Sequence, residues 1–391
     1  MLSKEDNELL SRVGPGTPAG ELLRRYWYPV ARVADLTEEQ PTKIVRMLGE
    51  DLVLFKDKSG NVGLIQDHCA HRGASLLYGR VEERGIACAY HGWLYDTKGD
   101  CLECPAEPAG SKFHMTVKMR AYPIQAVCGL YFTYMGPLPA PALPKYDIFV
   151  RRDGRRSLQL RGIVDANYVQ AMENSVDPAH LQILHQRTAA RGRPITDTTR
   201  GFTDDVQSFD FYLTDYGIMK KRVYTDGTID EHPLIFPNIL RQGNGIEIRV
   251  PRDDTHMWIW ELRFHPTENG EEVDPNEPPE LVATEPHKDK YDVIHPDAVY
   301  TMNRVDAEDY WAWETQGALP DRSIERLASS DRGIVMFRDL LKEQIEKVQR
   351  GEDPLGVIRD PNHAMIDTNL SHSLIVEVGL FPPTPAIATK W

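Results

Sequence analysis

The sequence is short of basic residues and of cysteine. Lysine and arginine together number 45 against 59 aspartates and glutamates, so the chain carries a formal charge of −14. Nucleic acids and anionic membranes are bound by basic faces, and we expect neither as a partner. Only five cysteines occur. Cys101 and Cys104 have the spacing of a redox or zinc pair, but the sequence has no second such pair, so we expect these two and Cys128 to be free thiols.

Long apolar runs are also missing. No run reaches the roughly 18 residues that a membrane-spanning helix needs. The first thirty residues carry charges throughout, unlike the apolar core of a signal peptide. We therefore expect a cytoplasmic protein with no membrane partner. With 391 residues, of which 41% are hydrophobic, the chain is long enough for two or three domains with their own cores.

A proline-rich stretch divides the chain. Residues 136–141 read Gly-Pro-Leu-Pro-Ala-Pro, which is typical of a linker. We predict a helical segment over residues 1–30, a β-domain over 31–150 and a larger α+β domain with an antiparallel sheet over 151–391. The predicted elements are helices at 4–13, 18–27 and 332–350, strands at 44–47, 52–55, 62–65, 115–119, 130–135, 206–213, 218–225, 246–250 and 257–264, and a mobile acidic excursion or lid at 267–297.

Two short motifs each combine a cysteine with a histidine. They are Cys69-Ala70-His71 and Cys88-Ala89-Tyr90-His91, separated by sixteen residues. Two thiolates suit one ferric ion and two neutral imidazoles suit another, so this set favours an iron–sulfur cluster with mixed ligation. A structural zinc site is the alternative. Zinc fingers usually pair both cysteines in one hairpin and both histidines on one helix, whereas each motif here offers one sulfur and one nitrogen.

A second group of candidate ligands lies in the larger domain. The helical stretch Asn167–His180 is followed after four residues by His185. Two imidazoles with a distant carboxylate form the facial arrangement of a mononuclear non-haem iron site. On a straight helix the two histidines would lie about 140° apart, so both bind one metal only if the helix is distorted or ends between them. We predict a kink or π-bulge near residues 181–184.

Together these features resemble the α subunit of a Rieske non-haem iron aromatic-ring oxygenase. The resemblance implies a helix-grip-like catalytic domain, in which helices flank the antiparallel sheet. A Rieske-type electron-transfer protein is a remaining alternative, because it would need only the cluster. By resemblance, Cys69, His71, Cys88 and His91 hold a Rieske [2Fe-2S] cluster, while His180 and His185 bind a mononuclear Fe(II).

The resemblance also gives roles to two polar residues that precede the iron ligands. Asp177 is expected to connect the cluster ligand His91 of a neighbouring subunit to His180, and Asn174 is expected close to the iron. From its position before a proline, Asp177 could also be a helix-capping residue. Tyr168 departs from the family pattern, in which Phe or Trp often follows the first Asn of this helix.

The third iron ligand is expected on a late helix, before an aromatic-rich stretch. Residues 308–314, Glu-Asp-Tyr-Trp-Ala-Trp-Glu, resemble that segment, and we predict Asp309 as the ligand. Asp309 could also belong to a solvated acidic turn that caps the helix. The alternative ligands are Asp306, Glu308 and Asp331.

Residues 9–18 and 134–137 look like the phthalate dioxygenase-like branch of the family. That branch implies a homotrimer or stacked trimers, in which the cluster of one subunit serves the iron of the next. It also implies O₂ as the oxidant and an NADH-dependent reductase, carrying flavin and its own plant-type [2Fe-2S] cluster, as the electron donor.

Substrates of this branch are mostly aromatic acids, which need a cation in the pocket. Arg222, Arg241 and Arg249 lie on predicted strands and are candidates, although each is more often a solvated strand residue. We expect hydroxylation or O-demethylation of a substituted aromatic acid in aromatic catabolism. Cis-dihydroxylation of a phthalate-like substrate is the alternative, because the same iron site serves all three reactions.

Overall fold

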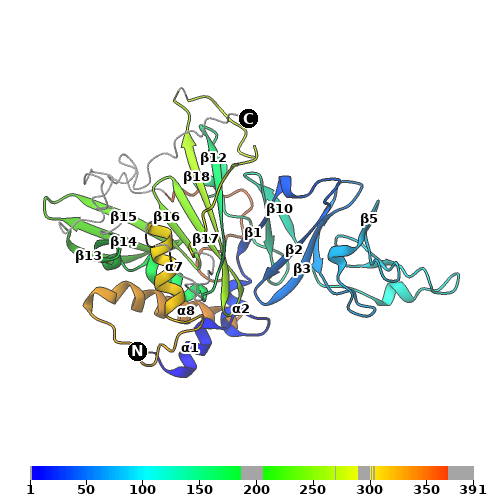
Figure 1. The fold of residues 1–391 in the computed structure, drawn as a ribbon, viewed down its shortest axis with the longest axis horizontal. Helices are drawn as coiled ribbons and strands as arrows, with labels where there is room; N and C mark the ends of the chain where they lie inside the picture. The colour runs from blue at the N-terminus through cyan, green and yellow to red at the C-terminus, as the bar shows by residue number, and fades with distance from the viewer. Residues whose placement is uncertain are drawn as a thin grey trace, which may run out of the picture.

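The computed structural model describes residues 2–185, 206–268, 270–288, 300, 302 and 304–368. These residues form a smaller lobe of short β-sheets and a larger lobe around one wide sheet (Figure 1). Among the described helices, none is both long and apolar enough to cross a membrane. The domain boundaries at residues 31 and 150 stay predictions.

The smaller lobe contains three antiparallel sheets, and the predicted strands at 44–47, 52–55, 62–65 and 130–135 are all present in it. The sheets are β2 (Thr42–Met47), β3 (Glu50–Lys56), β4 (Val62–Gln66) with β9 (Ala121–Tyr122); β5 (Arg80–Glu82), β6 (Gly85–Ala87), β7 (Leu94–Tyr95) with β8 (Cys101–Glu103); and β1 (Trp27–Arg32), β11 (Leu130–Tyr134) with β10 (Ile124–Val127).

One predicted strand of the smaller lobe is wrong. Residues 115–119 begin inside a 3₁₀ turn, which Thr116 closes by donating its hydroxyl to the Phe113 carbonyl at 2.7 Å. The segment then pairs only through a single bridge, between Lys118 and Asp100. Local hydroxyl capping competes here with strand pairing.

The larger lobe is organised around an eight-stranded sheet. All neighbouring strands are antiparallel except β12 and β19, which are parallel. Strand β19 falls within residues 267–297, the segment predicted as a mobile excursion, so this segment is attached to the edge of the sheet at residues 280–282. The strand order is β13 (Val206–Thr214), β14 (Gly217–Tyr224), β15 (Ile229–Ile235), β16 (Ile239–Gln242), β17 (Gly245–Asp253), β18 (His256–Pro266), β12 (Gly154–Val164) and β19 (Glu280–Val282).

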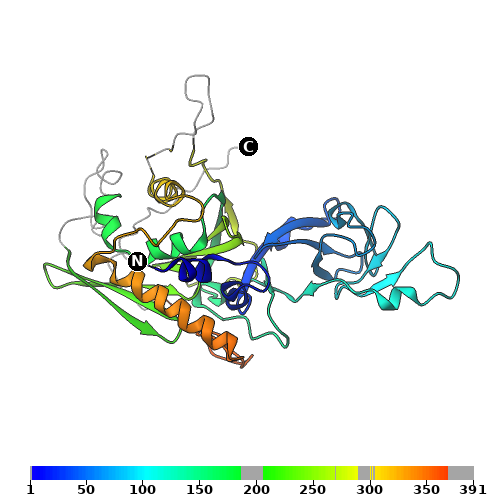
Figure 2. The same ribbon diagram turned by 90° about the horizontal axis from the view of Figure 1, so that it is seen from below.

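Helices of the described chain cover this sheet and its ends. The N-terminal helices contact α8 although they precede the smaller lobe in sequence, and Figure 2 shows them beside this long helix. The predicted second helix is too long, because strand β1 already begins at Trp27. The helices are α1 (Lys4–Ser11), α2 (Pro18–Leu23), α3 (Asp147–Val150), α4 (Tyr168–Ser175), α5 (Ala179–Ile183), α7 (Val305–Thr315) and α8 (Arg332–Gln349), with 3₁₀ turns η1 (Val33–Asp35), η2 (Leu76–Tyr78), η3 (Phe113–Thr116) and η5 (Ser329–Asp331).

A buried ion pair network fixes α4, which leads into the second group of candidate ligands. Glu173 on α4 accepts hydrogen bonds from Arg322 at 2.9 Å and from Arg338 on α8 at 2.7 Å, and all three side chains are buried. Arg322 also donates to Asn7 on α1 at 3.0 Å. The carboxylate of Glu173 therefore joins three helices in a low-dielectric environment.

Replacing Glu173 by Gln should lower the free energy of unfolding of the larger lobe by about 3 kcal/mol, because it leaves buried guanidinium groups without their carboxylate. Urea unfolding followed by tryptophan fluorescence measures this change. Glu343→Gln is the matched control, since its side chain is 55% exposed and its pair with Lys347 lies on the surface of α8. We expect a change within about 0.5 kcal/mol for the control. Equal effects of the two substitutions would contradict the structural role of Glu173.

Candidate functional site

The two Cys-His motifs form matching loops in the smaller lobe. In each loop a glycine amide donates to the cysteine carbonyl four residues before it, Gly73 to Cys69 at 2.8 Å and Gly92 to Cys88 at 2.9 Å. Both glycines have a φ of 73°, a left-handed conformation that glycine adopts without strain. The two loops therefore have equivalent backbones, as expected if both hold one bound group.

Four donor side chains meet between these loops. Cys69 and Cys88 are buried, His71 is exposed, His91 is half-buried, and the Nδ1 atoms of the two rings are 3.1 Å apart. Two nitrogens that each lie about 2.1 Å from one tetrahedral ion would be about 3.4 Å apart. The paired nitrogens and the paired sulfurs thus fit an iron–sulfur cluster with mixed ligation.

The sulfur side of this site is also suited to a bound cation. Burial raises the pKa of the Cys69 thiol, and the charge of Cys88 raises it further. A metal ion would reverse this effect by stabilising both thiolates. Tyr95 lies with its hydroxyl 3.2 Å from the Cys69 sulfur, where a hydrogen bond can tune the potential of a cluster.

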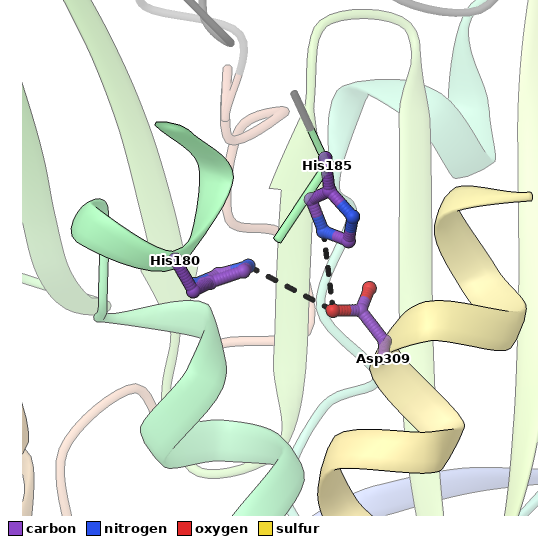
Figure 3. A group of neighbouring side chains, drawn as sticks. All are labelled: His180, His185 and Asp309. Atoms are coloured by element: carbon purple, nitrogen blue, oxygen red, sulfur yellow. Dashed lines mark ion pairs between the residues drawn. The ribbon is translucent and has the colours of Figure 1, made fainter. Parts of the chain in front are cut away.

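A second donor set lies between α5 and α7 (Figure 3). His180 is on α5, His185 follows the end of that helix, and Asp309 is on α7. Asp309 Oδ1 is 3.7 Å from His180 Nε2 and 3.2 Å from His185 Nε2. One ligand atom from each of the three residues lies within 4.8 Å of the others. Two imidazoles and one carboxylate at this spacing fit a mononuclear iron with open coordination positions.

The chain bends twice to bring these ligands together. Helix α4 ends at Ser175, and a short break precedes α5, which ends at Ile183. His185 therefore does not continue the helix that carries His180, and both rings point towards Asp309 (Figure 3). The sequence raised two possibilities, a distorted helix or a helix that ends between the histidines. The structure shows the second, and residues 181–184 do not form the predicted kink or π-bulge.

Carboxylates and an amide surround the second donor set. Glu308 Oε2 lies 2.8 Å from His185 Nδ1, Asp177 Oδ2 lies 3.6 Å from His180 Nδ1, and Asn174 donates to Asp309 Oδ1 at 3.1 Å. Partners on the far ring nitrogen orient metal-binding histidines. Glu308, an alternative ligand from the sequence, thus contacts the ring nitrogen that faces away from the donor set.

Electrostatics make the donor set attractive to a cation. Burial by itself opposes the charged forms, but Asp309 and Glu308 raise the pKa of His185 to about 9, and the two histidines lower the pKa of Asp309 to about 2. Burial likewise opposes the charge of Asp177, yet His180 lowers its pKa. A bound metal would replace the proton on His185 as the partner of Asp309.

The donor set opens into a cavity that is partly open to solvent. Among the described residues, Arg249 lines the cavity, but the other two predicted substrate contacts do not. Arg222 and Arg241 are buried in ion pairs with Asp230 and Asp147. The basic side chains that line the cavity are Arg161, Lys220 and Arg249.

Comparisons with known proteins identify the family. Residues 26–123 match the family described as Rieske [2Fe-2S] domain, and residues 253–376 match LigXa C-terminal domain like. The 5,5'-dehydrodivanillate O-demethylase oxygenase subunit of Sphingobium sp. (strain NBRC 103272 / SYK-6) is 40% identical over 374 residues, which cover 92% of this chain and 84% of that protein. The chain belongs to the Rieske oxygenase family.

Further relatives agree with this assignment. The phenoxybenzoate dioxygenase subunit alpha of Ectopseudomonas oleovorans is 35% identical, with 89% of this chain and 87% of that protein covered. Among solved structures, the oxygenase of carbazole 1,9a-dioxygenase in its ferredoxin complex matches with a TM-score of 0.63 at 19% identity, covering 90% of this chain and 99% of that one. The last likeness confirms the predicted α+β fold. This Rieske oxygenase is therefore an enzyme that uses a Rieske [2Fe-2S] cluster and a mononuclear iron.

Several residues of the cavity were not predicted from the sequence of this Rieske oxygenase. Lys220 and His232 lie opposite each other on β14 and β15, and Arg161 comes from β12. Each is a polar residue at a buried strand position. A polar residue at a strand position expected to face the core was the signal in the sequence that could have indicated them. Their meeting at the cavity depends on sheet register, which the sequence did not reveal.

Proposed function

We propose that this Rieske oxygenase hydroxylates or O-demethylates a substituted aromatic acid. The observation that carries the proposal is the convergence of two histidines and one aspartate at a cavity that basic side chains also line. The 40% identity to an O-demethylase oxygenase subunit supports the reaction type. In this proposal the cluster ligands are Cys69, His71, Cys88 and His91, the iron ligands are His180, His185 and Asp309, and the residues that support them are Asp177 and Asn174.

The bound groups would supply the electron transfer and the O₂ chemistry of oxygenation. The residues of the chain itself hold the ligands in place and position the substrate. Glu308 orients His185 through its contact with Nδ1. The side-chain amide of Asn174 donates a hydrogen bond to Asp309 Oδ1, the oxygen that lies near both histidines. The cavity beside α5 and α7 then places the substrate next to the three ligands.

Cis-dihydroxylation is the second candidate reaction. It is favoured by the 35% identity to a subunit named for phenoxybenzoate dioxygenase. The name of that relative also supports an aromatic carboxylate as the substrate class. The iron ligands are the same in both proposals, and the shape of the cavity around the substrate ring would decide between them.

For the partners, we propose O₂, an NADH-dependent flavin and [2Fe-2S] reductase, and a homotrimer or stacked trimers located in the cytoplasm. Strand β5, which lies between the two Cys-His motifs in the sequence, is in the smaller lobe, whereas α7 is in the larger lobe (Figure 1). This separation within one chain supports electron transfer from the cluster of one subunit to the iron of another. Sedimentation of the iron-loaded enzyme tests the assembly.

One experiment tests the function as a whole. The iron-loaded enzyme is combined with a surrogate reductase, NADH and a panel of aromatic acids and methoxy-aromatics, and the products are identified by mass spectrometry. Formaldehyde release indicates O-demethylation, and a cis-diol indicates dihydroxylation. Iron content of about three per chain, two in the cluster and one mononuclear, is expected. A content of two with no product from any substrate would leave only an electron-transfer protein.

The contact between Glu308 and His185 leads to a separate prediction. Glu308→Gln should weaken binding of the mononuclear iron by roughly 10- to 100-fold, because the neutral amide orients the imidazole and strengthens its basicity less well. Competition with a chelator measures the affinity, while the visible spectrum of the cluster reports that the smaller lobe is intact. Glu285→Gln, a change on the exposed partner of Arg304, is the control. Unchanged iron affinity in Glu308→Gln would contradict the orienting role.

A further inference from the structure

Lys220 differs from Arg161 and Arg249, which also line the cavity, because no carboxylate of the described residues forms an ion pair with it. Arg161 pairs with Glu261 and lies 3.3 Å from Asp306, and Arg249 pairs with Glu247 at 3.0 Å. The Lys220 ammonium donates to the Ser175 carbonyl at 3.0 Å. Among the described residues, no carboxylate lies within the 4.0 Å that defines an ion pair with it.

The sheet register explains why no carboxylate of the described residues lies within ion-pair distance of Lys220, although Asp177 and Asp230 act on it from further away. Lys220 lies directly opposite His232, and Arg222 lies directly opposite Asp230, so all four side chains share one face of strands β14 and β15. Asp230, the acidic residue of this group, is already in contact with Arg222 and His232. It pairs with Arg222, and its Oδ1 is 3.1 Å from His232 Nε2. The nearest acidic residue on the adjoining strand therefore serves other groups.

Burial makes this arrangement costly for the free protein. Lys220 is only 4% exposed and lines the cavity beside the proposed iron ligands. Burial, with the positive charges of Arg222 and Arg249, lowers the pKa of Lys220 to about 7, although the carboxylates of Asp177 and Asp230 oppose this shift. A buried ammonium with one backbone acceptor has two further N–H groups that can donate. An anionic oxygen entering the cavity would satisfy both the charge and a donor.

We propose that Lys220 is the substrate-binding cation of this site and pairs with an anionic oxygen of the substrate, either a ring carboxylate or a phenolate. The inference rests on the proposed aromatic substrate. It replaces the three arginines expected from the sequence with a residue that the sequence did not single out. The arginine that does line the cavity, Arg249, is already bound to Glu247 and to the α4 backbone.

Equilibrium binding to four probes tests the inference. Vanillate carries a carboxylate and a phenol, veratrate only the carboxylate, methyl vanillate only the phenol, and methyl veratrate neither. Their dissociation constants are measured by calorimetry on the anaerobic, iron-loaded enzyme. Lys220→Met, which keeps an unbranched side chain one atom shorter and removes its charge, should weaken vanillate binding by roughly 10- to 100-fold and change methyl veratrate binding by less than about twofold.

The single-group probes identify the anion. A loss for veratrate alone assigns a carboxylate, and a loss for methyl vanillate alone assigns a phenolate. Lys221→Met is the matched control, because the adjacent residue removes the same charge from the opposite face of β14. It should bind all four probes like the unaltered enzyme.

Two results would overturn the inference while the proposed function stands: equal weakening of the charged and uncharged probes by Lys220→Met, or no weakening of either. If Lys220→Met does not fold, the unaltered enzyme still decides, since it should bind vanillate at least about tenfold more tightly than methyl veratrate. Equal affinities overturn the inference. Failure of the unaltered enzyme to bind any probe would instead overturn the proposed substrate class, and the role of Lys220 with it.

Discussion

Replacing His180 by alanine should abolish turnover and remove the mononuclear iron while leaving the visible spectrum of the Rieske cluster unchanged. His180 offers one of three ligand atoms that lie within 4.8 Å of one another. Loss of one ligand leaves an incomplete facial site, and the rate enhancement that depends on the metal is lost with the ion. We expect turnover to fall by at least roughly a thousandfold, which corresponds to a few kcal/mol of transition-state stabilisation.

Three measurements on the same preparation separate the possible causes. Iron analysis should fall from about three to about two per chain, the spectrum of the oxidised cluster should persist, and substrate-dependent O₂ uptake should cease. His256→Ala is the control, because that histidine is 41% exposed and pairs with Asp253 away from the cavity. Retention of the third iron together with full activity in His180→Ala would show that His180 is not a ligand.

Local spacing made the two Cys-His loops predictable. Each motif contains its cysteine, its histidine and the glycine that closes the turn within five residues, so sequence and geometry are closely coupled. His180, His185 and Asp309 were also predicted to lie together, although Asp309 is more than a hundred residues away, because the resemblance pointed to the aromatic-rich segment on α7. The structure brings these three residues together as expected.

Contacts that depend on register or on helix ends were not predictable. The orientation of Glu308 towards His185 depends on where α5 ends and how α7 is rotated. The attachment of β19 to β12 is a parallel contact made across a long connection, and a three-residue strand in a proline-rich acidic segment gives almost no periodic signal. Lys220 has no ion-pair partner among the described residues because Asp230 contacts Arg222 and His232 instead. Only the pairing of β14 with β15 determines these contacts.

Asp177 lies where a change of charge should affect electron transfer more than structure. Its Oδ1 accepts the Ala179 amide at 2.9 Å and so caps the start of α5, while Oδ2 lies 3.6 Å from His180 Nδ1. Capping and the contact with His180 therefore use different oxygens of one side chain. Asparagine keeps an oxygen for the cap but replaces the second oxygen by an amide, which cannot accept a proton from the imidazole.

Asp177→Asn should therefore slow reoxidation of the reduced cluster by roughly 10- to 100-fold, because it removes the carboxylate charge beside His180 on the proposed route. Stopped-flow absorbance of the reduced, substrate-bound enzyme mixed with O₂ measures this rate. Asp274→Asn is the matched control, because Asp274 also accepts an amide two residues ahead, at 2.9 Å, but on the surface. Iron content and cluster spectrum should be normal in both variants. If the cluster of Asp177→Asn is reoxidised as fast as that of the control, Asp177 is only a helix cap, and electrons reach the iron by another route.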